Sequence, residues 1–445
     1  MEDHSKGILE EINDNLNNDS KGRIGVPGRI LSKLKQEGNK KRTINNIIKY
    51  QKREKKNIKK SLKNKNIQII NKNENIQKSI KIRNPGVDLI RMIAMLGIII
   101  NHLVYQGNGL GKFPQYKRQL LLLNSLFFWH NDGYILISGV VGYKSNKYSN
   151  LLYLWLSTLF YSILIPIYFA KISSHSNKSL NISVEYFPVI FKLYWFFTIY
   201  FGMYLFLPVI NKGISLLTKV EFKLLIISLI GIFSFWKGVK NPKKDIFMMC
   251  NGFSVSWFLC LYLVGAYIGK YNQKYNSIKK LAISFICLFI YGTVTLFYYK
   301  IINNQLTLGQ GYLKNKIVII LNQILNLDFD SVLKVAQSIS ICLFFLQINY
   351  NQYIGKIFSF FGPLNFGVYL IHMNIVFNYK ILIRIFTKDK NNLSLNSTLL
   401  LILKKTLTIY FSCIFIEYLR FILFRLIRTT KICILLEAWI YKLLS

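Results

Sequence analysis

Residues 84–107 form an apolar stretch that is long enough to cross a membrane but contains four polar side chains. Asp88 and Arg91 lie near its beginning, and Asn101 and His102 lie near its end. A charged side chain at membrane depth costs roughly 3 kcal/mol, so these groups are unfavourable on a helix surface that faces lipid. We therefore expect all four to face the interior of a helix bundle.

The spacing of Arg91 and His102 places them on nearly the same face of that helix. Ten residues separate the two, which corresponds to about 16 Å along the helix axis and a rotation of about 20° beyond full turns. One helix face thus carries a fixed cation and, further along, a titratable base. An unperturbed imidazole has a pKa of about 6.5, so it can accept a proton from a hydroxyl at neutral pH.

The composition indicates many such spans. The chain has 445 residues, of which 52% are hydrophobic, 15% aromatic and 17% charged. We predict an all-α integral membrane protein with about ten transmembrane helices in one bundle. Hydropathy places these spans at residues 86–106, 123–144, 151–171, 187–210, 221–236, 252–270, 279–301, 332–349, 357–378 and 398–424.

The first 84 residues differ in character from the rest of the chain. They contain 22 Lys or Arg and 9 Asp or Glu, which gives +13 of the net charge of +39. They bury too little apolar surface to fold, so we predict a disordered basic cytoplasmic tail. A tail that lies on anionic lipid head groups is an alternative. Nucleic acid is not an expected partner, because no recognition module accompanies the charge.

This topology divides the chain into three parts. Residues 1–84 form the tail, residues 85–428 the transmembrane domain, and residues 429–445 a short cytoplasmic segment. An even number of spans returns the C-terminus to the side of the N-terminus. We therefore expect a multi-pass protein of the cell membrane with both termini in the cytoplasm.

Polar residues in later spans are further candidates for a site. His130 and His372 fall at the same predicted depth as His102, and either can instead be a hydrogen-bonded packing residue. Asp132 can orient an imidazole or bind a substrate hydroxyl, or it can be a carboxylate at the lipid boundary. Glu417 and Arg420 stand three residues apart and are expected to satisfy each other.

Aromatic and small residues allow a structural and a functional interpretation. The span around Trp195 carries an aromatic stripe, which is either a packed helix face or a stacking wall for a sugar ring or an adenine. Ser138 and Gly139 are small residues in mid-span, where close helix packing is their usual role. The six cysteines are scattered without metal-ligand spacing, so no metal is expected.

Five segments together resemble a known family. Asp88 to Arg91, followed by His102 ten residues later, resembles the first-span signature of the acyltransferase 3 family of membrane O-acyltransferases. Further segments similar to that family follow in the same order, and the resemblance covers about residues 85–425. They are Leu136-Ile137-Ser138-Gly139, Tyr194-Trp195-Phe196-Phe197-Thr198 with Leu207-Pro208, Trp257-Phe258 with residues 262–268, and Phe366-Gly367-Val368-Tyr369-Leu370-Ile371-His372.

The resemblance implies an activity and roles for single residues. It implies transfer of an acyl group, usually acetyl, from acyl-CoA to a hydroxyl of a cell-surface glycan or lipid-linked sugar. Arg91 would contact the acyl donor, and His102 would be the catalytic base or a relay for the acyl group. We expect Asp132 to act with His102. Substrate contacts are expected from Asn101, Trp195 and His372.

Two other classes of protein predict similar spans. A carrier or flippase would use the buried polar groups to line a path without covalent chemistry. A membrane-anchored interaction protein would place its function in the basic tail and leave Arg91 and His102 as packing residues. Consumption of acyl-CoA distinguishes the enzyme from both. The sequence leaves the acceptor, the acyl chain length and the oligomeric state open.

Overall fold

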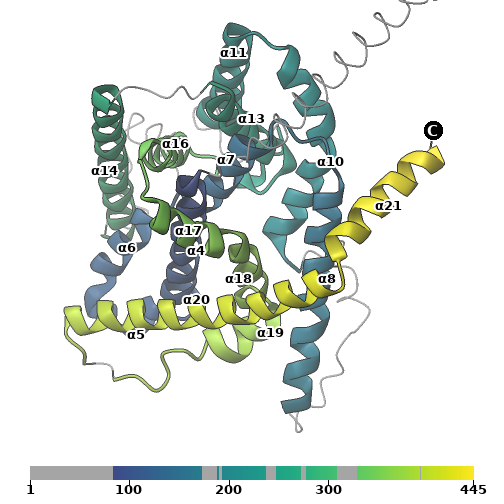
Figure 1. Ribbon diagram of the computed structural model, residues 1–445. Coiled ribbons are helices and arrows are strands. Elements are labelled where there is room, and N and C mark those ends of the chain that lie inside the picture. Colours follow the sequence, from purple (N-terminus) through teal and green to yellow (C-terminus); the bar gives the residue numbers. More distant parts are fainter. Residues whose placement is uncertain are drawn as a thin grey trace, which may run out of the picture. The chain divides into compact units, whose positions relative to one another are not determined.

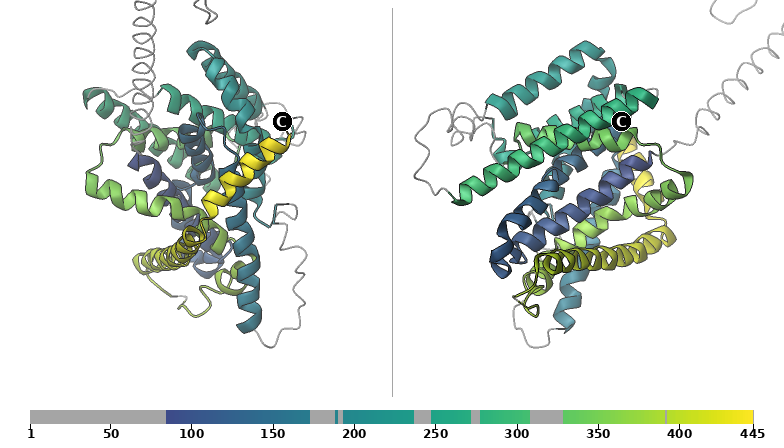
Figure 2. Two further views of the ribbon diagram at one scale, coloured as in Figure 1. Left: turned by 45° about the vertical axis from the view of Figure 1, so that its right-hand side comes forward. Right: turned by 90° about the vertical axis from the view of Figure 1, so that its left-hand side faces the viewer.

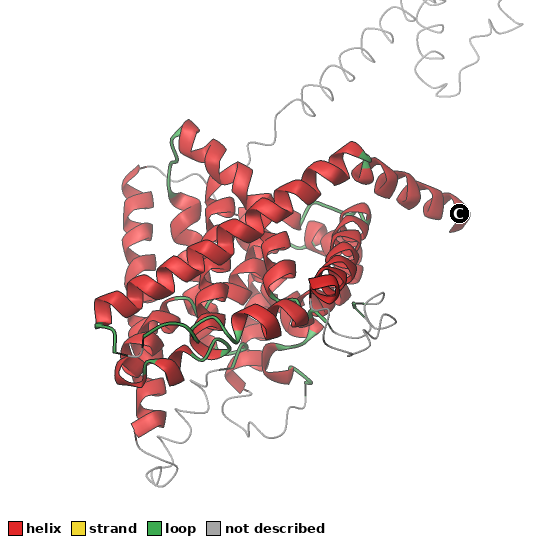
Figure 3. Cartoon of the chain, turned by 90° about the horizontal axis from the view of Figure 1, so that it is seen from below, coloured by secondary structure: helices red, strands yellow, loops and turns green. Residues whose placement is uncertain are grey.

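The computed structural model describes residues 84–172, 188–189, 193–236, 247–271, 277–307, 328–390 and 392–444. Within these ranges all regular secondary structure is helical, as Figure 3 shows, which confirms the predicted all-α class. Residues 1–83 of the predicted disordered tail lie outside the described residues.

Figure 1 shows the described helices coloured along the sequence, from purple to yellow. The longer ones are α4 (Pro85–Tyr105), α6 (Lys117–Leu126), α7 (His130–Gly142), α8 (Ser149–Ile172), α10 (Trp195–Leu216), α11 (Lys219–Ile230), α13 (Val255–Tyr271), α14 (Ser277–Thr307), α16 (Val332–Gln347), α17 (Gln352–Phe361), α18 (Asn365–His372), α20 (Leu395–Leu426) and α21 (Thr429–Leu444). Short helical turns are α5 (Gly109–Lys112), η1 (Pro114–Tyr116), η2 (Gly231–Trp236), η3 (Cys250–Gly252), η4 (Gly362–Leu364), α19 (Ile375–Phe377) and η5 (Asn378–Leu382).

Six segments among the described residues are long and apolar enough to cross a membrane. They are Pro85–Tyr105, Ser149–Phe169, Trp195–Leu216, Ile278–Phe297, Gln352–His372 and Leu395–Leu426. The helices Val255–Tyr271 and Val332–Gln347 are apolar but shorter. The structure therefore supports a multi-span membrane protein, and the predicted count of ten spans is not confirmed.

The predicted span at residues 123–144 is two helices. Helix α6 ends at Leu126 and α7 begins at His130, with a turn at residues 127–129 between them. The Trp129 indole N–H donates to the carbonyl of Leu126 at 3.1 Å, which stabilises this turn. Phe127 packs against Gly97 of α4, where an added Cβ would lie 2.7 Å from the Cβ of Phe127. Hydropathy alone does not register the break, because the turn residues are themselves apolar.

Two other predicted spans are also interrupted. The segment at residues 221–236 divides into α11 and η2, and neither is long enough to count as a span. The segment at residues 357–378 comprises parts of α17 and η5 with η4, α18 and α19 between them. Bundle interiors tolerate such breaks, because neighbouring groups satisfy the freed backbone atoms.

Helix α4 runs through the middle of the described helices (Figures 1 and 2) and packs against α6, α7, α16, α17, α18 and α20. Its start is well defined, since the Asn84 side chain accepts a hydrogen bond from the Gly86 N–H at 2.9 Å and Pro85 occupies the first turn. Asp88 in that turn suits the positive end of the helix dipole. The expectation that this helix lies inside the bundle is confirmed.

Helices α7 and α13 approach each other closely through small residues. An added Cβ at Gly265 would lie 2.0 Å from the carbonyl oxygen of Leu136. At Gly139 it would lie 2.1 Å from the carbonyl oxygen of Tyr262, and at Gly269 2.4 Å from that of Val140. The structure thus confirms close packing as the role of Gly139, and this contact fixes the position of α7.

The predicted pair Glu417 and Arg420 is confirmed. Arg420 donates to both carboxylate oxygens, at 2.7 Å and 2.9 Å, and to the Ser157 hydroxyl at 3.1 Å. The Tyr161 hydroxyl donates to Glu417 at 2.7 Å. This buried network joins α20 to α8 and is structural.

The C-terminal segment is helical. Helix α21 follows α20 after a short turn and lies against α8 (Figure 1). The Glu437 carboxylate accepts hydrogen bonds from the N–H groups of Tyr148 and Ser149, at 2.7 Å and 3.0 Å. It therefore caps the start of α8.

Candidate functional site

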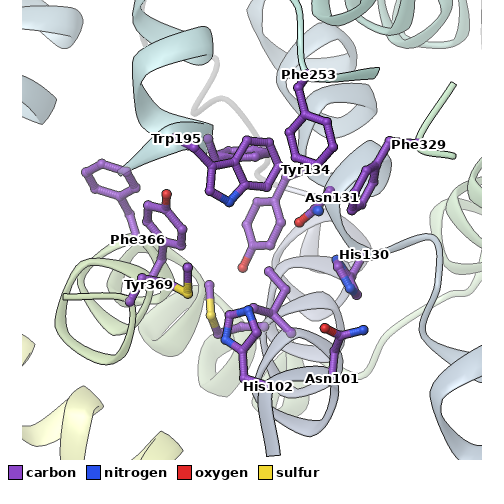
Figure 4. Close-up of a pocket in the computed structure, with 14 residues that line it drawn as sticks. Asn101, His102, His130, Asn131, Tyr134, Trp195, Phe253, Phe329, Phe366 and Tyr369 are labelled. Carbon is purple, nitrogen blue, oxygen red and sulfur yellow. The ribbon is translucent and has the colours of Figure 1, made fainter. Parts of the chain in front are cut away.

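A cavity of about 160 Å³ lies between α4, α7, α10 and α18 (Figure 4). Figure 4 shows His102 and Asn101 at one side of it and Trp195 and Phe253 at the opposite side. Its lining combines aromatic walls with a few polar groups, which is typical of sites that bind small molecules. The lining residues are Met95, Ile98, Asn101, His102, His130, Asn131, Tyr134, Trp195, Phe196, Phe253, Phe329, Phe366, Tyr369 and Met373.

His102 reaches the cavity because it shares a helix face with Met95 and Ile98. These residues follow one another at intervals of three and four, and all three line the cavity. The His102 Nδ1 atom is buried and has no hydrogen-bond partner among the described residues. A half-buried imidazole at a cavity wall is placed to exchange a proton with a bound molecule.

Asn101 also lines the cavity, one position before His102. Its side-chain N–H donates to the Asn124 carbonyl oxygen on α6 at 2.9 Å. This hydrogen bond fixes the amide beside the cavity, and the predicted substrate contact by Asn101 stays a prediction.

The break between α6 and α7 brings two further polar residues to the cavity. His130 and Asn131 open α7, and both line the cavity. His102 interacts electrostatically with both His130 and His372, so these three histidines form one cluster.

His372 lies beside His102 rather than on the cavity wall. The two ring centroids are 5.3 Å apart and the planes are inclined by 40°. The His372 ring is fully buried, and its Nδ1 lies 2.6 Å from the carbonyl oxygen of Val368. The predicted substrate contact by His372 is untested by this geometry, since its neighbour in the cluster is the ring of His102.

Asp132 is buried in the first turn of α7 and does not line the cavity. It interacts electrostatically with Lys334 of α16 and with Asp330. Among the described residues it makes no hydrogen bond to His102, and its predicted role in catalysis stays a prediction. Burial and Asp330 disfavour a negative charge on Asp132, whereas the Lys334 ammonium favours it.

Lys334 is a site residue that the sequence analysis did not single out. Its side chain is fully buried, and its Nζ has no hydrogen-bond partner among the described residues. The Nζ atom lies 3.3 Å from the ring centroid of Phe329, and Phe329 lines the cavity. A lysine inside the predicted span at residues 332–349 was the signal that could have identified it.

Arg91 lies outside the cavity lining, one turn before Met95 on the same helix face. Its Nη1 donates to the Asp88 carboxylate at 2.8 Å, and its side chain is 24% exposed. The Tyr134 hydroxyl, from the cavity wall, donates to the main-chain carbonyl of Arg91 at 2.7 Å. The structure confirms the shared face of Arg91 and His102 and leaves donor binding untested.

The aromatic stripe of α10 forms part of the cavity wall. Trp195 and Phe196 both line the cavity, and the Trp195 ring packs against Phe253 with centroids 4.7 Å apart. Phe329 adds a second edge contact to Phe253 at 4.8 Å. The rings of the stripe pack together and also line the cavity, and the predicted stacking of a sugar ring or an adenine on them stays a prediction.

These features define an all-helical membrane protein with a partly polar cavity inside its helices. The profile of the acyltransferase 3 family, described as an acyltransferase domain, matches residues 84–418 of the 445. The chain belongs to this family, and it is a membrane acyltransferase. No curated protein and no solved structure matches the chain significantly. Among the described residues no group of three His, Cys, Asp or Glu side chains could hold a metal ion.

Proposed function

We propose that the protein transfers an acetyl group from acetyl-CoA to a hydroxyl of a cell-surface glycan or lipid-linked sugar. The observation that carries this proposal is the His102 imidazole at the wall of a cavity inside a membrane acyltransferase. Supporting it, the opposite wall is aromatic and suits the face of a sugar ring.

His102 acts as the general base in this proposal. It takes the proton from the acceptor hydroxyl while the hydroxyl oxygen attacks the thioester carbonyl. The carbon–sulfur bond then breaks, and the thiolate of CoA receives the proton from the His102 imidazolium. The side-chain amides of Asn101 and Asn131 line the cavity and can donate to the oxyanion that forms between these steps.

The size of the cavity supports a short acyl group. Its volume is about 160 Å³, below the range of about 300–1,000 Å³ that is usual for drug-sized ligands. An acetyl group and the reacting hydroxyl fit such a volume, whereas a long acyl chain needs a longer channel. We therefore propose acetyl as the transferred group.

The donor is proposed to approach along α4 from the side of Arg91. The guanidinium presents several N–H donors, of which only Nη1 bonds to a described residue. Its planar fork suits a phosphate or carbonyl of acyl-CoA. A pantetheine arm that extends from Arg91 past Met95 would bring the thioester to His102. This direction agrees with termini in the cytoplasm, where acyl-CoA is found.

The experiment uses the full chain in lipid nanodiscs with acetyl-CoA labelled in the acetyl group. Membrane glycan extracts serve as the acceptor, and both free CoA and labelled glycan are quantified. The proposal predicts that the two products appear in equal amounts. Movement of the glycan across a vesicle membrane without release of CoA would instead support a carrier.

A further inference from the structure

We propose that His372 is a positioning residue, which fixes the tautomer and ring orientation of His102 through a hydrogen bond between the two imidazoles. This inference rests on the proposed role of His102 as the base. It assigns His372 no contact with substrate, in agreement with its absence from the cavity lining among the described residues.

Each of the two rings buries a nitrogen that lacks a partner. The His102 Nδ1 and the His372 Nε2 are both buried and without a hydrogen bond to any described residue. The rings themselves are neighbours, with centroids 5.3 Å apart. Buried polar atoms without partners are rare because each loses its hydrogen bonds to water. One hydrogen bond between these two atoms would satisfy both.

The direction of this hydrogen bond follows from Val368. Its main-chain carbonyl can only accept, so the His372 Nδ1 that lies 2.6 Å away carries the proton. In the neutral ring the His372 Nε2 is then an acceptor. The His102 Nδ1 must donate to it. The χ2 torsion of histidine is broad, so a rotation of the His102 ring, with His372 held at Val368, is the adjustment that the proposal requires.

This arrangement leaves the His102 Nε2 as the basic atom. With its proton held on Nδ1, His102 presents the Nε2 lone pair for the acceptor hydroxyl. After proton transfer the imidazolium keeps its Nδ1–H bond to His372, and the new proton leaves from Nε2 to the CoA thiolate. No proton passes to His372. Its part corresponds to that of a group that orients a catalytic histidine.

His130 is the competing partner for the His102 Nδ1. Its own Nδ1 is also buried without a partner among the described residues, and it interacts electrostatically with His102. However, His130 lines the cavity, and the ring contact of His102 is with His372. The Val368 carbonyl fixes the tautomer of His372, whereas the side chain of His130 hydrogen-bonds to Asn131.

The direct test is ¹⁵N NMR of the full chain in nanodiscs with ¹⁵N-labelled histidine. The sequence contains five histidines, and the spectrum of His102→Gln identifies the His102 signals. The proposal predicts a protonated Nδ1 and an unprotonated Nε2 for His102 in the wild type. His372→Asn should mix the two tautomers of His102, because it loses the acceptor. An unchanged His102 spectrum in His372→Asn, or a change only in His130→Asn, would overturn the proposal.

Two substitutions of His372 separate positioning from packing. Gln places an amide oxygen near the position of Nε2 and keeps the acceptor, whereas Asn reaches only the position of Nδ1. His372→Asn should lower kcat by about 10- to 100-fold with little change in KM, the range usual for loss of an orienting partner. The kcat of His372→Gln should stay within about threefold of the wild-type value. Equal losses in both variants, per amount of folded protein, would contradict positioning.

The NMR result is independent of catalysis. If the His102 tautomer depends on His372 but His102→Gln retains its turnover, the hydrogen bond stands and the base role fails. The reverse result is His102→Gln without activity, together with a His102 tautomer that is the same in the wild type and in His372→Asn. In that case the base role stands and the positioning role fails.

Discussion

The guanidinium of Arg91 and the carboxylate of Asp88 form an ion pair within the first turns of α4, with Nη1 2.8 Å from Oδ1. Asp88 is fully buried and Arg91 is partly exposed. The buried carboxylate therefore orients the guanidinium, of which only Nη1 bonds to a described residue. An arginine held in this way is well suited to bind an anion.

Arg91→Lys tests donor binding. Lysine keeps the charge but loses the planar fork, so we expect the KM for acyl-CoA to rise by about tenfold, equivalent to about 1.4 kcal/mol. The abundance of folded protein should fall less than the affinity for the donor. Arg384→Lys, at an exposed position, is the matched control. If the KM for acyl-CoA does not change, Arg91 has a structural role as the partner of Asp88 and does not bind the donor.

Trp195→Ala tests the aromatic wall. Removing the ring should raise the KM for the glycan acceptor by about tenfold with a smaller change in kcat, because the ring contributes binding more than chemistry. Trp439→Ala on α21, where the ring is 59% exposed, should have no effect. A rise only in the KM for acyl-CoA would assign the wall to the adenine, and no change would leave it a packing surface.

Lys334→Met tests the buried charge cluster behind Phe329. Asp132 and Asp330 lose a nearby cation, and breaking a buried charge pair costs about 3–5 kcal/mol. We expect a lower melting temperature, and partial recovery when Asp132→Asn is added. The exposed Lys404→Met is the control. If Lys334→Met has the melting temperature of the wild type, Lys334 does not stabilise the fold through its interaction with Asp132 and Asp330.

Gly265→Ala tests the contact of α7 with α13. The new methyl group would meet the carbonyl oxygen of Leu136 at 2.0 Å, and such overpacking costs about 1–3 kcal/mol or more. We expect little folded protein in size-exclusion chromatography. Gly292→Ala, where no described atom lies within 4 Å of the added Cβ, should be neutral or stabilising. Equal yields of folded protein for Gly265→Ala and Gly292→Ala would contradict the close approach of α7 and α13.

The sequence predicted the helical class, the interior position of α4 and the pairing of Glu417 with Arg420. The helical class follows from the apolar composition. The other two follow from polar residues in apolar segments, because burial of such groups demands a partner. The shared face of Arg91 and His102 follows from helix geometry alone.

The breaks and the partners across helices could not be predicted in this way. The turn between α6 and α7 consists of apolar aromatic residues, so its hydropathy equals that of a continuous span. The pairing of His102 with His372, and of Asp132 with Lys334, depends on contacts between segments more than 200 residues apart in the sequence. A single sequence contains no signal for these contacts.

The rate of acyl transfer by His102→Gln tests the central claim most directly. Gln preserves size and polarity but cannot act as a base, and loss of a general base costs about 10²- to 10⁴-fold in rate. Labelled acyl-CoA and a supplied glycan are used across a range of pH, with rates normalised to folded protein and His372→Gln as the internal control. The wild-type rate should fall toward low pH, because a protonated imidazole cannot accept a proton, and the His102→Gln rate should lack this dependence. A turnover of His102→Gln above about a tenth of the wild-type value would contradict the base assignment, because loss of a general base is expected to lower the rate further than that.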